Sequence, residues 1–180
     1  MLRSLKRRAE FQRKAGEIYG AIVTQARQPA FYAQLGIPDT PTGRYEMVVV
    51  HLFLVLERLR GGGADAEAVA QVLVDAFVAD MDDSLRELGT GDVGVPRRVK
   101  RAAAGFYERS KDYRTALAHG GDALAKALAR YLTAEDGGTR ASALAVYVRA
   151  AAASLAAQSV GALTEGRLSF PDPVATKSPA

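Results

Sequence analysis

The segment from Met47 to Leu56 constrains the fold of this chain more than any other part of its sequence. As a helix it is apolar on nearly every side, so other elements must surround it. It is about half as long as the roughly 20 residues of a membrane-spanning helix, and it contains His51. The β-branched run 48–50 would also suit a central strand, but no other segment offers partner strands. We therefore predict a buried central helix from about Arg44 to Arg60.

Apolar residues at three- and four-residue steps predict further helices on both sides of this centre. We expect them from the N-terminus to about 28 and over about 65–88, 95–119, 122–133 and 139–163. The length of 180 residues and the hydrophobic share of 48% fit one globular domain. The predicted fold is all-α, with about six helices around the central apolar helix. We expect a basic arm at 1–14, the helical domain at 15–165 and an extended, proline-containing tail at 166–180.

Several classes of function are disfavoured by what the sequence lacks. There is no cysteine, which removes disulfides, thiol nucleophiles, zinc knuckles and iron–sulfur ligation. Phosphate-binding loops, dinucleotide fingerprints, nucleophile elbows and two-histidine metal motifs are missing as well. His51 lies in the most apolar helix, where a hydrogen-bonded core histidine is favoured over a general base. We expect no catalytic residues, no cofactor and no metal.

Two residues of opposite charge occupy apolar positions in the predicted helices. Asp80 falls in the apolar stripe of helix 65–88, and Arg109 falls in that of helix 95–119. A buried carboxylate costs several kcal/mol unless it is paired, so we predict an ion pair between Asp80 and Arg109, with Arg44 as the alternative partner. The favoured role of this pair is to fix the register of the helices, and a role in recognition is the alternative.

An acidic cluster follows along the same helix; it consists of Asp75, Asp80, Asp82, Asp83 and Glu87. Asp83 and Glu87 lie one turn apart, and their like charges repel by a few tenths of a kcal/mol unless a cation is near. A basic partner or a metal would relieve this repulsion, and the alternative is a solvated face on which Asp82 pairs with Arg86. Other hard oxygen ligands at fixed spacing are missing, so a metal is disfavoured.

The basic arm contains a single acid, Glu10. Its cations are Arg3, Lys6, Arg7, Arg8, Arg13 and Lys14. Such an amphipathic helix can lie on an anionic membrane surface, contact RNA phosphates of a ribosome, or be solvated. The loop from Gly36 to Arg44 is the other unusual segment. It holds two prolines, two glycines and several potential N-caps, which is more than a connector needs.

Segments spread along the chain carry a specific combination of motifs. They are Tyr19–Arg27 (YGAIVTQAR), Pro29, 31–32, 36–40, 43–46, His51, 80–82, 85–87, 91–92, 95–96, 106–107 with Arg109, Tyr113 with 116–117, and 166–171. Together they resemble the ubiquinol-cytochrome c chaperone family. One departure is Glu108, where the family often has glycine, so a close backbone approach is not expected there.

The resemblance implies an all-helical assembly factor without catalytic residues. Its client would be newly made cytochrome b, which it would help to mature and to enter the bc1 complex. Further partners would be the ribosome, an anionic membrane surface and a second assembly protein, whereas DNA is not expected. The short segment before the matching motifs indicates a bacterial member, which we expect in the cytoplasm, peripheral on the inner face of the inner membrane.

We expect client or partner contacts around the loop and along the acidic helix. The predicted residues are Arg27, Phe31, Tyr32, Pro38, Asp39, Thr40, Arg44, Asp82, Arg86, Glu87 and Asp92. A groove between helices would shield an apolar client segment, whose basic flanks the acidic residues would favour. Two alternatives are a basic-arm adaptor at the membrane surface or ribosome that does not hold the client, and a small-molecule or haem-handling protein with a pocket around His51.

Overall fold

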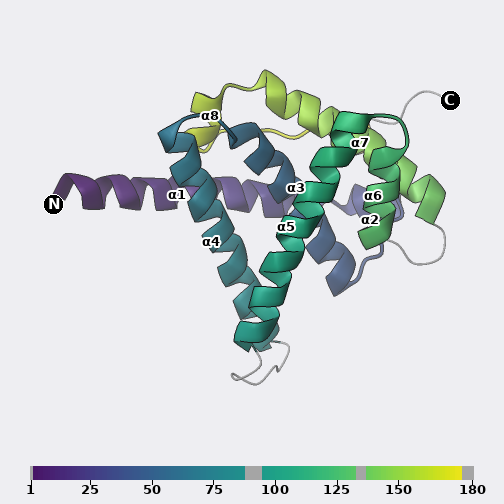
Figure 1. Ribbon diagram of the computed structural model, residues 1–180, viewed down its shortest axis with the longest axis horizontal. Helices are drawn as coiled ribbons and strands as arrows, with labels where there is room; N and C mark the ends of the chain where they lie inside the picture. Colours follow the sequence, from purple (N-terminus) through teal and green to yellow (C-terminus); the bar gives the residue numbers. More distant parts are fainter. Residues whose placement is uncertain (1, 88–94, 133–136, 176–180) are drawn as a thin grey trace.

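The computed structural model describes residues 2–87, 95–132 and 137–175, and within these residues the chain is all-helical (Figure 1). The elements are α1 (Leu2–Ala26), α2 (Pro29–Ala33), α3 (Pro41–Leu59), α4 (Ala64–Glu87), α5 (Val95–His119), α6 (Ala123–Leu132), α7 (Gly137–Ala157) and α8 (Val160–Thr164). The predicted all-α class is confirmed. No helix within the described ranges is long and apolar enough to cross a membrane.

Helix α3 is the centre of the fold, as the sequence predicts. Every residue from Met47 to Val55 is buried, and α3 contacts α1, α4, α5, α6, α7 and α8. The β-branched residues of this run are accommodated because burial on all sides outweighs their small helix-propensity penalty. Helix α1 adds one buried face, formed by Ala15, Ile18, Ile22 and Ala26. It packs against α3 and against α4.

The remaining helices pack around α3, and consecutive helices along the chain contact each other from α4 to α7. Helices α4 and α5 form an antiparallel pair that converges at one end of the molecule, and α5 then contacts α6, which packs on α7 (Figure 1). The N-terminal end of α1 projects beyond the other helices (Figure 1). The boundaries predicted between arm and domain (14/15) and between domain and tail (165/166) stay a prediction. Helix α1 continues through the first, and the turn after α8 includes the second.

The single helix predicted over 139–163 is wrong, because the chain breaks between α7 and α8. Ser159 takes an extended backbone conformation, and its side chain accepts a hydrogen bond from the Ala162 amide at 3.1 Å, which caps a new helix. The Gln158 side chain is occupied by the tail: it donates to the Ser169 carbonyl and accepts from the Ser169 amide. Capping and tail docking thus end α7 despite its strong helix formers.

The N-terminus of α3 explains the composition of the preceding loop. Thr40 is the N-cap and accepts from the Gly43 amide at 3.1 Å, and Pro41 takes the first helical position. A Cβ on Gly43 would lie 2.0 Å from the Pro38 carbonyl oxygen, so only glycine fits there. The loop is therefore folded tightly back onto the start of the helix.

Candidate functional site

A hollow of about 550 Å³ opens on the surface where α1 ends, α2 begins and the loop enters α3. Its lining residues are Arg27, Pro29, Tyr32, Ala33, Asp39 and Arg44. Four of them were predicted from the sequence as contact residues: Arg27, Tyr32, Asp39 and Arg44. The structure thus brings together residues that are up to 17 positions apart in the chain (44 − 27).

Local hydrogen bonds fix the walls of this hollow. Pro29 begins α2, and the Tyr32 hydroxyl donates to the Ala26 carbonyl at 2.8 Å, which ties α2 to the end of α1. In the loop and at the start of α3, Arg44 Nε donates to Asp39 Oδ1 at 2.6 Å. Because α2 and α3 are both anchored in the core, the polar groups of the hollow are held on a rigid base.

Three charges surround the Tyr32 phenol. The Arg44 guanidinium lowers the pKa of the Asp39 carboxyl, so this acid stays ionised. Burial raises the pKa of Tyr32, and Asp39 adds to the rise, whereas the two arginines oppose it. The hollow therefore presents a neutral phenol, one paired carboxylate and two guanidinium groups. These groups can bind and orient charged or polar atoms, and they contain no nucleophile next to a base.

Other predicted contact residues lie elsewhere, and one prediction is wrong. Phe31 is fully buried and makes edge contacts with the rings of His51 and Tyr147, so it belongs to the core rather than to a contact surface. Thr40 is the helix cap described above, and half-buried Pro38 lies beside a cavity of only about 10 Å³. Asp82, Arg86 and Glu87 belong to α4 but their side chains are outside the described part, as is all of Asp92.

The predicted ion pair between Asp80 and Arg109 is wrong. Arg109 instead pairs with Glu46, to which its Nε and Nη2 donate at 2.8 and 2.7 Å. Asp80 is exposed and accepts a hydrogen bond from the Tyr19 hydroxyl at 2.9 Å. Arg44, the alternative partner, is taken by Asp39. Near Asp80, α4 packs against α1. Asp80 lies at the edge of this contact, where its carboxylate reaches solvent.

The Glu46–Arg109 pair links three helices. Glu46 is 2% exposed on α3, and the Arg109 side chain is 20% exposed on α5. The Arg109 guanidinium also lies over the Tyr131 ring of α6, 4.5 Å from its centroid. Burial raises the pKa of the Glu46 carboxyl, and the guanidinium opposes that rise. The pair is therefore a structural element of the core.

His51 is a hydrogen-bonded core histidine, as predicted. Its Nδ1 donates to the Met47 carbonyl at 2.7 Å, and its Nε2 accepts from the Tyr147 hydroxyl at 2.8 Å. Burial lowers the pKa of His51 to about 4, so the ring is neutral at physiological pH. Gln25 extends the network, because its amide donates to the Tyr147 hydroxyl and to the Pro171 carbonyl.

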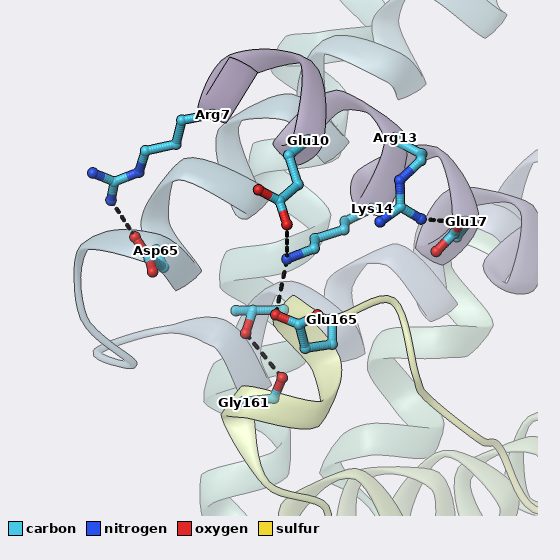
Figure 2. Close-up of polar contacts among 9 residues, drawn as sticks. Arg7, Glu10, Arg13, Lys14, Glu17, Asp65, Gly161 and Glu165 are labelled. Carbon is cyan, nitrogen blue, oxygen red and sulfur yellow. Dashed lines mark hydrogen bonds and ion pairs between the residues drawn. The ribbon is translucent and has the colours of Figure 1, made fainter. Parts of the chain in front are cut away.

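The basic arm is partly bound to the rest of the protein (Figure 2). Lys14 is buried and pairs with Glu10 at 2.9 Å and with Glu165 beyond α8 at 2.8 Å (Figure 2). Its predicted contact with a membrane or ribosome is therefore wrong. Arg7 pairs with Asp65 at the start of α4 at 2.5 Å, but both side chains stay largely exposed.

The structure describes the side chains of only some of the other arm cations. Arg13 pairs with Glu17 one turn away at 2.6 Å and remains exposed, and Lys6 is exposed. The side chains of Arg3 and Arg8 are outside the described part. The exposed cations of the arm are therefore available to a partner, whereas Lys14 joins α1 to the turn after α8.

Two polar residues of the core, Glu46 and Tyr147, were not predicted from the sequence. Glu46 stands directly before the apolar run, where a charge at the edge of a buried helix signals a buried partner. Tyr147 is the only aromatic residue in a helix otherwise rich in alanine, and that contrast was the available signal. No group of three or more metal-binding side chains occurs in the described ranges.

The fold and the site define an all-α, single-domain protein with a charged surface hollow. The chain belongs to the ubiquinol-cytochrome c chaperone family, whose model matches residues 33–170. It is similar to the Cbp3 homologue from Brucella abortus, whose crystal structure superposes with a TM-score of 0.87 at 42% identity, over 97% of this chain and 98% of that chain. The comparison with curated proteins found no match. The family implies a chaperone role rather than an enzymatic one.

Proposed function

We propose that this protein binds newly synthesised cytochrome b and promotes its maturation into the bc1 complex. Its membership in the ubiquinol-cytochrome c chaperone family supports the type of client. The observation that carries the proposed contact surface is the hollow, in which four predicted contact residues meet: Arg27, Tyr32, Asp39 and Arg44. A client segment would lie along the loop and α2.

A rigid site suits a chaperone that holds its client without chemistry. The bond between Tyr32 and Ala26, the Thr40 cap and the close approach of Gly43 to Pro38 hold the walls before a client arrives. Binding then costs little ordering of the chaperone, so modest contacts suffice for a transient complex. Asp82, Arg86, Glu87 and Asp92 remain proposed as a second contact region.

Photo-crosslinking during synthesis of cytochrome b tests this proposal. A photoreactive amino acid at Ala33, an exposed residue that lines the hollow, should give an adduct with pulse-labelled cytochrome b. The adduct should disappear during the chase, when the client enters the complex. The matched control is the same probe at Ala118, an exposed alanine of α5 that does not line the hollow. Equal adducts from both positions would contradict binding at the hollow.

A basic-arm adaptor at the membrane surface or ribosome is the second candidate. It is favoured by the exposed cations Lys6 and Arg7 near the projecting N-terminal end of α1 (Figure 1). Charge reversal of Arg3, Lys6, Arg7 and Arg8 should then release the protein from membranes or ribosomes without changing its thermal stability. Unchanged sedimentation with both would leave the arm a solvated segment. We propose peripheral attachment to the inner face of the bacterial inner membrane through this arm.

The haem-handling alternative receives no support. His51 is fully buried and both of its ring nitrogens are hydrogen-bonded, so the ring offers no free ligand atom. A haem titration is therefore expected to leave the Soret band of free haem unchanged. A red-shifted band that is lost in His51→Leu would restore this alternative.

A further inference from the structure

Arg27 differs from the other charged residues of the hollow, Asp39 and Arg44, which bind each other. The exposed Arg27 side chain makes no hydrogen bond or ion pair with any residue in the described ranges. With two cations and one anion, the lining carries a net charge of +1 (2 − 1). The charge of the lining that is not balanced by the Asp39–Arg44 pair is therefore positive.

The donors of the hollow favour an anion over a cation. The terminal amino groups of Arg44 make no hydrogen bond within the described ranges, since Asp39 takes only Nε. Arg27 and Arg44 therefore each offer free donors on a planar guanidinium group, whose geometry suits a carboxylate. A basic ligand would meet only one carboxylate in the lining, and that carboxylate is already paired with Arg44.

The remainder of the lining is apolar and small. Pro29, Ala33 and the Tyr32 ring contribute carbon surface beside the two guanidinium groups. The Tyr32 hydroxyl proton is used by the Ala26 carbonyl, so the phenol does not add a donor. The volume of about 550 Å³ exceeds that of a single small anion and accommodates a carboxylate together with a neighbouring apolar side chain.

We propose that this hollow binds an acidic segment of the client polypeptide, with an aspartate or glutamate carboxylate between Arg27 and Arg44 and an adjacent apolar side chain on Pro29 and Ala33. The proposal rests on the proposed function, because it assumes a polypeptide client. It assigns to the hollow the opposite preference from the acidic residues of α4, which suit basic flanks of a client. The protein would then bind acidic segments of the client at the hollow and basic segments at α4.

Paired peptides test this assignment. Labelled peptides that cover the water-exposed segments of cytochrome b are titrated with the full-length protein, and each acidic peptide is compared with its Asn or Gln counterpart by fluorescence anisotropy. We expect the wild-type protein to bind the acidic form about tenfold more tightly than the amide form, as is typical of a charge-assisted hydrogen bond at a partly solvated site. Arg27→Gln should lose this preference and bind both forms alike.

Arg101→Gln is the matched control, because Arg101 is an exposed arginine of α5 that does not line the hollow. It should keep the full preference, which separates the site from the net charge of the protein. Equal binding of acid and amide peptides, or equal losses in Arg27→Gln and Arg101→Gln, would overturn the carboxylate assignment while leaving client binding intact. Displacement of bound peptide by millimolar inorganic phosphate, at constant ionic strength, would instead identify a site for a free anion.

Failure of the proposed function gives a different result. If no cytochrome b peptide binds the wild-type protein and the Ala33 probe gives no adduct, both proposals are overturned together. Arg27 makes no side-chain hydrogen bond or ion pair with the part of the chain that the structure describes, so Arg27→Gln should melt at the wild-type temperature. This measurement shows that a change in binding does not come from unfolding.

Discussion

Removal of Arg109 should destabilise the protein strongly, because it leaves the Glu46 carboxylate buried without a partner. Glu46 is 2% exposed and accepts three hydrogen bonds from the guanidinium, at 2.7, 2.8 and 3.1 Å. Breaking a buried pair from one side costs about 3–5 kcal/mol, so we expect Arg109→Ala to lower the free energy of unfolding by that amount. Replacing both residues, as in Glu46→Leu with Arg109→Met, should cost no more than about 1 kcal/mol.

Urea unfolding monitored by circular dichroism measures these differences, and pH adds an independent check. Without Arg109, nothing opposes the rise in the pKa of Glu46 that burial causes. A carboxyl whose pKa is raised in the folded state binds protons more tightly there than in the unfolded state, so its contribution to stability falls as pH rises. The Arg109→Ala variant should therefore recover part of its deficit between pH 7 and pH 5.

The matched control is Arg114→Ala, which breaks the more exposed pair with Glu57. The side chains of that pair are 41% and 25% exposed, so its loss should cost less than about 1 kcal/mol. The reasoning about Glu46 is refuted if the double apolar variant is as unstable as Arg109→Ala. It is also refuted if the deficit of Arg109→Ala does not change with pH.

Three further predictions concern other residues described above. Asp80→Ala should cost less than about 1 kcal/mol in urea unfolding, because Asp80 is exposed and its side chain accepts one hydrogen bond from the residues that the structure describes. A loss of 3 kcal/mol or more (about that of a buried pair) would contradict this placement. His51 should lower the free energy of unfolding of the wild-type protein by about 3 kcal/mol between pH 6.5 and pH 4. The reason is that His51 is protonated near pH 6.5 in the unfolded state, whereas its pKa in the folded state is about 4. His51→Leu should lose this slope and His119→Gln, at the exposed histidine, should keep it; equal slopes in the two variants would refute the assignment. Gly43→Ala should lower the melting temperature and the yield of client adducts, because its Cβ would meet a backbone carbonyl, whereas Gly20→Ala on α1 meets nothing within 4 Å and should be neutral or stabilising. Equal melting of both alanine variants would show that the loop tolerates the change.

The fold was predictable from the sequence where a single physical effect dominated. The run from Met47 to Val55 is apolar on all sides, and the structure surrounds it with helices. Gly61, with a φ of +70°, ends α3 as a helix-stop glycine does. The break between α7 and α8 was not predictable from propensity, because it depends on a tail segment that docks from 11 residues further along the chain.

The candidate site was predictable only as a region. Arg27, Tyr32, Asp39 and Arg44 meet because α2 turns the chain back toward the loop, and the motif pattern identified these segments without their geometry. Phe31 was misplaced because it can point into the core while its neighbour on the same short helix, the half-buried Tyr32, lines the hollow. The partner of Arg109 was misidentified because periodicity shows that a charge faces inward, but not which charge of another helix meets it.

The tie between the two ends of the described chain has a consequence for biosynthesis. Lys14 and Gln25 of the first helix bind Glu165 and the Pro171 carbonyl, and the Phe170 ring lies against His51. The N-terminal helix leaves the ribosome first, yet its final partners are made last, after nearly all of the domain. A nascent chain that stops before residue 170 therefore leaves the His51 ring without the covering Phe170 ring. This chaperone therefore completes the contacts between its first helix and its C-terminal segment only after translation has passed that point.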